Sequence, residues 1–202
     1  ELLSYLADCC FNAALSFNKI GNFAKAGHYS EEAWRLYGRI LTESSEDMDE
    51  IDRIEILEHR AFSAFAAGMQ AEVSDHPQKA LEFLSFASRT YYKLYKEYAN
   101  LVDKEKKIEW LDKGSGASMF TGLTLEWLGN EEDAKNFYTL ATEIYDELLE
   151  KFGKELENYG EKTCIEKLEE QVEKYLTSIQ DEPNKEGEVP GSTPPGNVDG
   201  EH

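Results

Sequence analysis

Residues 14–40 have the sequence ALSFNKIGNFAKAGHYSEEAWRLYGRI, and this stretch decides the fold. Apolar residues on both sides of the central KIGN recur at intervals of three and four, which is the period of an amphipathic α-helix. Gly21 suits a left-handed turn conformation, and Asn22 suits the N-cap of a following helix. The stretch therefore predicts two helices joined by a tight turn.

The same pattern occurs three times along the chain, at a spacing of 54 residues. Residues 68–94 and 122–148 align with residues 14–40 without a gap. Over the 54 positions of a whole copy, chance would give roughly one identical column or fewer. Five columns hold the same residue in all three copies: Glu1/Glu55/Glu109, Leu3/Leu57/Leu111, Ala26/Ala80/Ala134, Ala33/Ala87/Ala141 and Tyr37/Tyr91/Tyr145. Internal repeats of about this length are typical of solenoids.

We therefore expect an all-α fold, a right-handed superhelical solenoid of three antiparallel helix hairpins with a 54-residue period. The repeat domain would span residues 1–180, with copies at about 1–54, 55–108 and 109–160. Residues 161–180 carry an apolar stripe backed by Glu and Lys, so we expect a terminal helix that caps the last hairpin. Residues 181–202 contain four prolines, four glycines and six acidic residues, which predicts a disordered acidic tail.

The columns resemble those of the tetratricopeptide repeat family, in which a small residue in the first helix and two alanines seven apart in the second flank a turn. The small residues are Ala14, Gly68 and Gly122, and the alanine pairs are Ala26/Ala33, Ala80/Ala87 and Ala134/Ala141. The period is longer than that family's, and its closing proline is absent. Helices of about 25 residues are similar to those of long-hairpin relatives such as the soluble NSF attachment proteins.

The resemblance implies a concave groove, lined by the first helix of each hairpin, that binds a peptide or a partner helix. The groove columns select Phe11, Leu15, Asn18, Phe65, Met69, Glu72, Met119, Leu123 and Trp127, and Asp8, Lys19, Phe62, Val73, Gly116 and Glu126 lie in the same columns. Two apolar ladders result, Phe11/Phe65/Met119 and Leu15/Met69/Leu123. Flexible Met and Phe side chains suit a hydrophobic segment. The alternative is that both ladders are core packing between repeats.

We expect a non-enzymatic scaffold or adaptor whose protein partner is apolar or basic. One alternative is a structural module that self-associates through its first hairpin, which lacks an evident N-terminal cap. A third reading, an all-helical enzyme, finds little support, because the four histidines show neither HExxH nor Glu-x-x-His spacing. We expect no metal and no cofactor.

The chain carries 41 acidic and 21 basic residues, a formal net charge of -20. Such a chain repels nucleic acid and anionic membrane surfaces, and no apolar stretch approaches the roughly 18 residues that span a bilayer. We therefore expect neither nucleic-acid binding nor membrane insertion.

Three cysteines cannot form a closed disulfide framework, which favours a cytoplasmic location. Because the chain opens at Glu1 and not at methionine, an upstream signal or anchor stays open as an alternative. Cys9 and Cys10 align with Ser63/Ala64 and Ala117/Ser118, so we expect small, buried packing residues.

Overall fold

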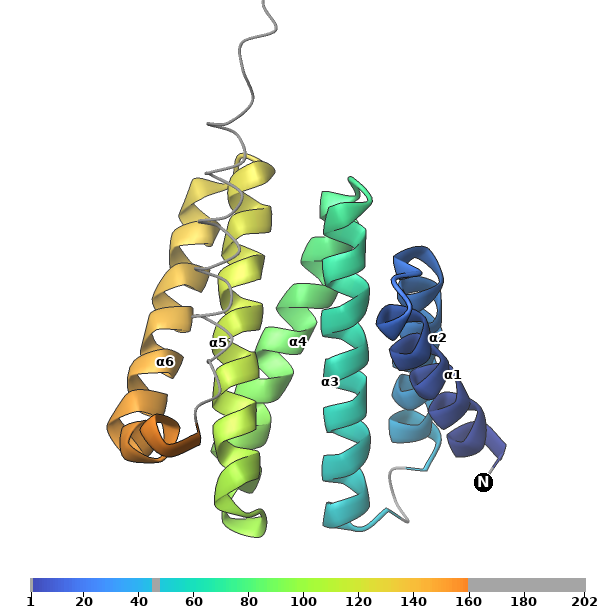
Figure 1. Ribbon diagram of the computed structural model, residues 1–202, viewed down its shortest axis with the longest axis horizontal. Helices are drawn as coiled ribbons and strands as arrows, with labels where there is room; N and C mark the ends of the chain where they lie inside the picture. The colour runs from blue at the N-terminus through green and yellow to red at the C-terminus, as the bar shows by residue number, and fades with distance from the viewer. Residues whose placement is uncertain (1, 45–47, 160–202) are drawn as a thin grey trace, which may run out of the picture. The chain divides into compact units, whose positions relative to one another are not determined.

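The computed structural model describes residues 2–44 and 48–159, and this part of the chain contains helices and no strand (Figure 1). The elements are α1 (Leu2–Lys19), α2 (Phe23–Glu43), α3 (Glu50–Val73), α4 (Pro77–Tyr98), the short 3₁₀-helix η1 (Ala99–Leu101), α5 (Lys104–Trp127) and α6 (Glu131–Tyr159). The all-α prediction is thus confirmed. The expected terminal helix at 161–180 and the expected tail at 181–202 lie outside the described residues.

The three turns within the hairpins share one backbone geometry. Gly21, Asp75 and Gly129 occupy the left-handed region, with φ of 73°, 60° and 77°. In each turn, the backbone amide of the residue that follows the left-handed residue donates a hydrogen bond to the carbonyl five residues before it. This is the hydrogen bond of a Schellman motif. These bonds run from Asn22 to Phe17, from His76 to Ala71 and from Asn130 to Leu125, each at 2.9 Å. Identical local chemistry therefore ends α1, α3 and α5.

Aspartate N-caps start the helices that follow the longer connections. The Asp49 carboxylate accepts a hydrogen bond from the Asp52 amide, and the Asp103 carboxylate accepts one from the Lys106 amide, each at 2.8 Å. Helices α3 and α5 consequently begin at Glu50 and Lys104. The copy boundaries that the sequence placed at 55 and 109 therefore fall inside helices. An alignment shows the spacing of a repeat but not its phase, which the caps set.

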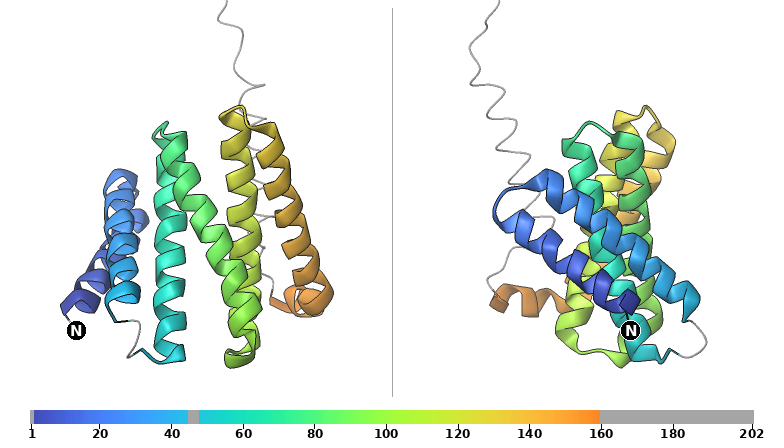
Figure 2. Two further views of the ribbon diagram at one scale, coloured as in Figure 1. Left: turned by 180° about the vertical axis from the view of Figure 1, so that it is seen from behind. Right: turned by 90° about the vertical axis from the view of Figure 1, so that its right-hand side faces the viewer.

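Helices two apart in sequence also contact each other, in two layers (Figure 2). Among the odd-numbered helices, the Phe11 and Phe62 rings lie 5.4 Å apart, and the Phe65 and Phe120 rings lie 6.0 Å apart. Among the even-numbered helices, Trp34 packs against Phe83 and Phe86, and Lys96 pairs with Glu147 at 2.7 Å. The first helices of the hairpins thus form one layer and the second helices the other.

The largest hydrophobic core joins α3, α4, α5 and α6 around buried Tyr91, Trp110 and Ile144. A smaller cluster around Ala33 and Tyr37 joins α1 to α2. Close approach within the hairpins depends on glycine. A Cβ atom at Gly68 would lie 2.7 Å from Leu84 Cγ, and one at Gly122 would lie 2.5 Å from Tyr138 Cε1.

The expectation that both cysteines of α1 are buried is wrong, because Cys9 is exposed and Cys10 is only partly buried. The equivalent residues Ser63 and Ala117 are 1% and 0% exposed. Those residues lie where α3 packs on α2 and α5 packs on α4. The same side of α1 faces no preceding helix in the described part of the chain.

Candidate functional site

The nine predicted groove residues lie on α1, α3 and α5, and none of them is fully buried. Phe11, Leu15, Phe65, Met69, Glu72 and Met119 are partly buried, whereas Asn18, Leu123 and Trp127 are exposed. The exposed fractions of Leu123 and Trp127 are 39% and 55%. The most accessible members therefore sit toward the C-terminal ends of these helices.

The N-terminal part of the ladders mainly holds helices together. The Phe11 ring lies 4.8 Å from the His59 ring, 5.4 Å from Phe62 and 6.4 Å from Tyr37. This aromatic cluster joins α1 to both α2 and α3. At Phe11 the core-packing alternative therefore describes the contacts better than an open groove does.

Phe65 and Met69 lie between Phe11 and the helix ends in the ladders, and both are partly buried. Both pack against the small buried cluster of Ala71, Ala80 and Leu84, and they are joined there by Phe120. Phe120 follows the ladder residue Met119 by one position, and the repeat columns did not select it. These side chains support the α3–α4 hairpin from the side that faces α5.

The C-terminal ends of α3 and α5 combine exposed apolar side chains with carboxylates. The Thr124 hydroxyl donates a hydrogen bond to Glu72, which ties the two helix ends together. Beside it, Val73 is 77% exposed and Trp127 is 55% exposed. Burial raises the pKa of the Glu72 carboxyl, and the hydrogen bond from Thr124 partly offsets this. We call Val73, Leu123, Trp127, Glu72 and Glu126 the helix-end patch.

The second carboxylate of this patch is oriented from the neighbouring helix. The Tyr138 hydroxyl of α6 donates to Glu126 at 2.7 Å. Burial and this hydrogen bond raise the pKa of Tyr138 to about 12. Tyr138 is therefore protonated at neutral pH and remains a donor to Glu126.

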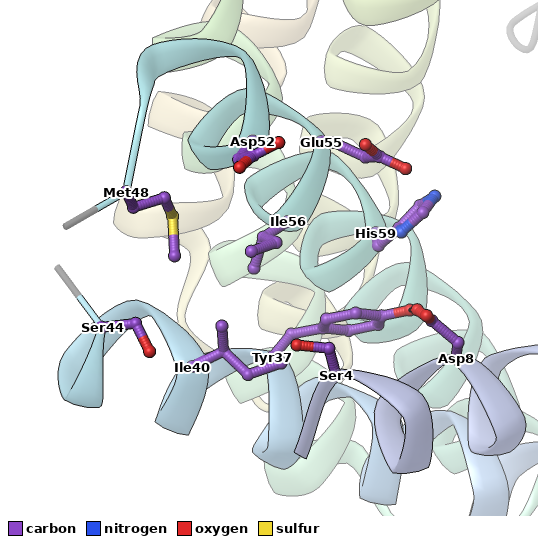
Figure 3. A pocket seen from close by; sticks show the side chains of 10 residues that line it. All are labelled: Ser4, Asp8, Tyr37, Ile40, Ser44, Met48, Asp52, Glu55, Ile56 and His59. Carbon is purple, nitrogen blue, oxygen red and sulfur yellow. Dashed lines mark hydrogen bonds between the residues drawn. The ribbon is translucent and has the colours of Figure 1, made fainter. Parts of the chain in front are cut away.

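A separate pocket of about 400 Å³ opens between α1, α2 and α3 (Figure 3). Its lining residues are Ser4, Asp8, Tyr37, Ile40, Ser44, Met48, Asp52, Glu55, Ile56 and His59. The Tyr37 hydroxyl donates to the Asp8 carboxylate at 2.9 Å. Burial, followed by this contact with Asp8, raises the pKa of Tyr37. The sequence selected Asp8 but gave no signal that Tyr37 and His59 would join it.

The electrostatics of this pocket favour a cation over an anion. Its ten lining residues include the carboxylates of Asp8, Asp52 and Glu55 and neither lysine nor arginine. Oxygen-rich walls of this kind suit an ammonium or guanidinium group. Within the described ranges, no group of three or more His, Cys, Asp or Glu side chains can hold a metal ion.

Residues 2–44 and 48–159 include no helix that is both long and apolar enough to cross a membrane. No family model matches the chain, and no curated protein matches it. Two solved structures of MamA are each 19% identical to the chain. The first match covers 66% of this chain and 95% of the MamA chain, with a TM-score of 0.17. The second covers 75% of this chain and 96% of the MamA chain, with a TM-score of 0.18. Overlaps with TM-scores this low assign neither a family nor a function.

Proposed function

We propose that this chain is a non-enzymatic scaffold or adaptor that binds an apolar, basic protein segment along its odd-numbered helices. The fold we infer for it is a right-handed solenoid of tetratricopeptide type with a 54-residue period. Two observations support this fold: the intra-hairpin turns recur at Gly21, Asp75 and Gly129, and α3 and α5 start 54 residues apart. A cytoplasmic location, favoured by the cysteine usage, belongs to the same proposal.

The observation that carries the binding proposal is the helix-end patch. Val73, Leu123 and Trp127 expose apolar surface on neighbouring helices, joined by the bond between Thr124 and Glu72. Exposed apolar side chains that gather in one region mark sites where a partner removes apolar area from water, and these three lie on two helix ends that the Thr124–Glu72 hydrogen bond connects. Aromatic residues such as tryptophan are also enriched at binding hot spots.

The carboxylates specify the charge of the partner. Glu72 and Glu126 border the apolar residues, so lysine or arginine on the partner would be attracted to them. Burial disfavours the charged form of Glu72, which its raised pKa expresses. A cation placed beside this carboxylate would relieve that penalty. An apolar segment with flanking basic residues fits both properties.

Three synthetic amphipathic peptides of equal length test the proposal by fluorescence anisotropy. One combines leucine with lysine, the second leucine with glutamate, and the third serine with lysine. We expect binding of the leucine–lysine peptide alone. Leu123→Glu should weaken it at least about tenfold, which is 1.4 kcal/mol.

Leu149→Glu on α6 is the matched control. The exposed fraction of Leu149, 44%, is similar to the 39% of Leu123, and Leu149 is not part of the helix-end patch. Equal binding of the serine–lysine peptide would reduce the effect to charge attraction and contradict an apolar site. Unchanged binding by Leu123→Glu would place the site elsewhere.

A further inference from the structure

The pocket between α1, α2 and α3 has a counterpart one copy further along the chain. Adding 54 to the number of each lining residue gives ten positions on α3, on α4, on α5 and in the connection before α5. These positions hold Glu58, Phe62, Tyr91, Leu94, Tyr98, Val102, Lys106, Glu109, Trp110 and Lys113. Both sets contain a tyrosine, Tyr37 or Tyr91, and a glutamate, Glu55 or Glu109, at the same place in the repeat. The pocket and its counterpart are therefore equivalent sites between consecutive hairpins.

In the counterpart, two lysines of α5 fill the site with ammonium groups. Lys106 Nζ donates to Glu58 at 2.7 Å and to Glu109 Oε2 at 3.0 Å. Lys113 Nζ donates to the other carboxylate oxygen of Glu109 and lies 4.9 Å from the centre of the Phe62 ring. One carboxylate thus accepts hydrogen bonds from two ammonium groups, and an aromatic ring adds a cation–π contact to one of them. We call this counterpart the lysine-filled site.

The pocket lacks both lysines. Asp52 and His59 stand at their positions, while the shared glutamate is retained as Glu55. Asp8 adds a carboxylate from α1, to which the Tyr37 hydroxyl donates at 2.9 Å. The lining therefore carries three carboxylates and neither lysine nor arginine, whereas two carboxylates and two lysines meet in the lysine-filled site. The pocket has the anionic half of an ammonium site without an ammonium group of its own.

The shape of the pocket favours an elongated organic cation over a metal ion. Asp52 lies on the wall that α3 forms, and Asp8 lies on the opposite wall (Figure 3). Within the described ranges, no group of three or more His, Cys, Asp or Glu side chains can hold a metal ion. Ile40, Met48 and Ile56 supply apolar surface for a short methylene chain. The volume of about 400 Å³ lies within the range of roughly 300 to 1,000 Å³ that is usual for small-molecule sites.

We propose that this pocket binds a short alkyl diammonium ion, whose two ammonium groups take the places that the Lys106 and Lys113 amines occupy in the lysine-filled site. The Glu55 carboxylate accepts hydrogen bonds from both groups, one on each oxygen. Asp8 and Asp52 supply the remaining negative charge, so the dication offsets two of the three carboxylates. The pocket is separate from the helix-end patch, and the proposal does not depend on the proposed protein partner.

Isothermal titration calorimetry of the 202-residue chain with putrescine, a four-carbon diamine, tests the proposal. We expect binding that weakens as salt rises, because salt screens the carboxylates. Butanediol, the neutral analogue, should not bind, and butylamine, with one ammonium group, should bind at least about tenfold more weakly. Nα-acetyl-lysine amide represents a lysine side chain of a protein. If it bound as tightly as putrescine, the pocket would be a receptor for protein lysines, and the diamine assignment would be overturned.

Two variants locate the binding. Glu55→Gln should weaken putrescine binding at least about tenfold, and Glu50→Gln is the matched control, because Glu50 is on the same helix but does not line the pocket. Asp52→Lys combined with His59→Lys copies the lysine-filled site and should not bind putrescine. The proposal would be overturned by a wild-type chain that does not bind putrescine, or by either pocket variant binding it as the wild type does while circular dichroism stays helical.

Discussion

The hydroxyl oxygens of Ser88 and Ser118 lie 2.6 Å apart in the contact between α4 and α5, and neither side chain is exposed to solvent. Ser118 also donates to the carbonyl of Gly114 at 2.8 Å. Because a hydroxyl has one proton, Ser88 must donate to Ser118. A directed pair of buried hydrogen bonds therefore joins consecutive hairpins.

This direction predicts unequal effects of the two alanine substitutions. Ser88→Ala leaves Ser118 bonded to Gly114 and should lower the free energy of unfolding by about 1 kcal/mol. Ser118→Ala leaves the Ser88 donor buried without its acceptor and should cost about 1 kcal/mol more. Urea unfolding of both single variants and of the double variant measures this. Equal and additive effects would contradict the assigned direction.

Replacing a helical glycine with alanine usually stabilises the helix, but we expect the opposite effect at Gly68, which packs against α4. Gly68→Ala would place Cβ 2.7 Å from Leu84 Cγ, and we expect destabilisation by about 1–3 kcal/mol from overpacking. Gly153→Ala is the control within α6, because a Cβ there would meet no heavy atom within 4 Å beyond the adjacent residues and the backbone of its own helix turn. There alanine should stabilise the helix by up to about 1 kcal/mol. Thermal unfolding of the two variants should shift in opposite directions.

The turn at Asp75 predicts a stabilising substitution. Asp75 has φ of 60°, while the equivalent turn residues are Gly21 and Gly129. A left-handed conformation costs a non-glycine residue roughly 1 kcal/mol, so Asp75→Gly should raise the midpoint of thermal unfolding. Gly129→Ala should lower it for the same reason. A destabilised Asp75→Gly variant would show that the Asp75 side chain contributes more than its backbone strain removes.

Glu72 predicts a pH-dependent stability. Its pKa is raised in the folded state, so the folded protein binds a proton more tightly there than the unfolded chain does. Stability from this group is greatest at low pH and falls as pH rises from the ordinary carboxyl pKa through the raised one. Glu72→Gln should therefore stabilise the protein at pH 7 by less than about 1 kcal/mol, with the difference vanishing at acid pH. Urea unfolding of the wild type and of Glu72→Gln, at pH 7 and at acid pH, measures this difference in stability.

Glu147 should show the opposite dependence. Burial would raise its pKa, but hydrogen bonds from Lys151 and Lys96 outweigh this and lower it. Its contribution is present above the ordinary carboxyl pKa and is lost as pH falls through the lowered one. Glu147→Gln should destabilise the protein at pH 7 by about 1 kcal/mol. An unaltered stability at pH 7 would mean that neither lysine pair contributes.

The alignment of three copies predicted the turns well and the surroundings of the site only in part. Gly21, Asp75 and Gly129 lie where the repeat columns placed them, because a Schellman turn depends on a few consecutive residues. The helix starts at Glu50 and Lys104 were missed, although Asp49 and Asp103 are N-cap residues in the sequence. A repeat alignment shows which residues are equivalent, whereas the first residue of a helix is set by its N-cap side chain.

For residues 2–44 and 48–159, the sequence alone determined that the chain is helical, that these helices form three hairpins and where each hairpin turns. These properties follow from periodicity and turn residues, which act over a few positions. Tertiary structure decided that Phe11 packs against His59 and Phe62, that Trp127 stays accessible and that Cys9 is exposed. Equivalent positions in the three copies carry similar residues, yet burial depends on which neighbouring helix covers each copy. Which helix covers a given copy is decided by how the helices pack into layers, and the sequence of the repeat does not specify it.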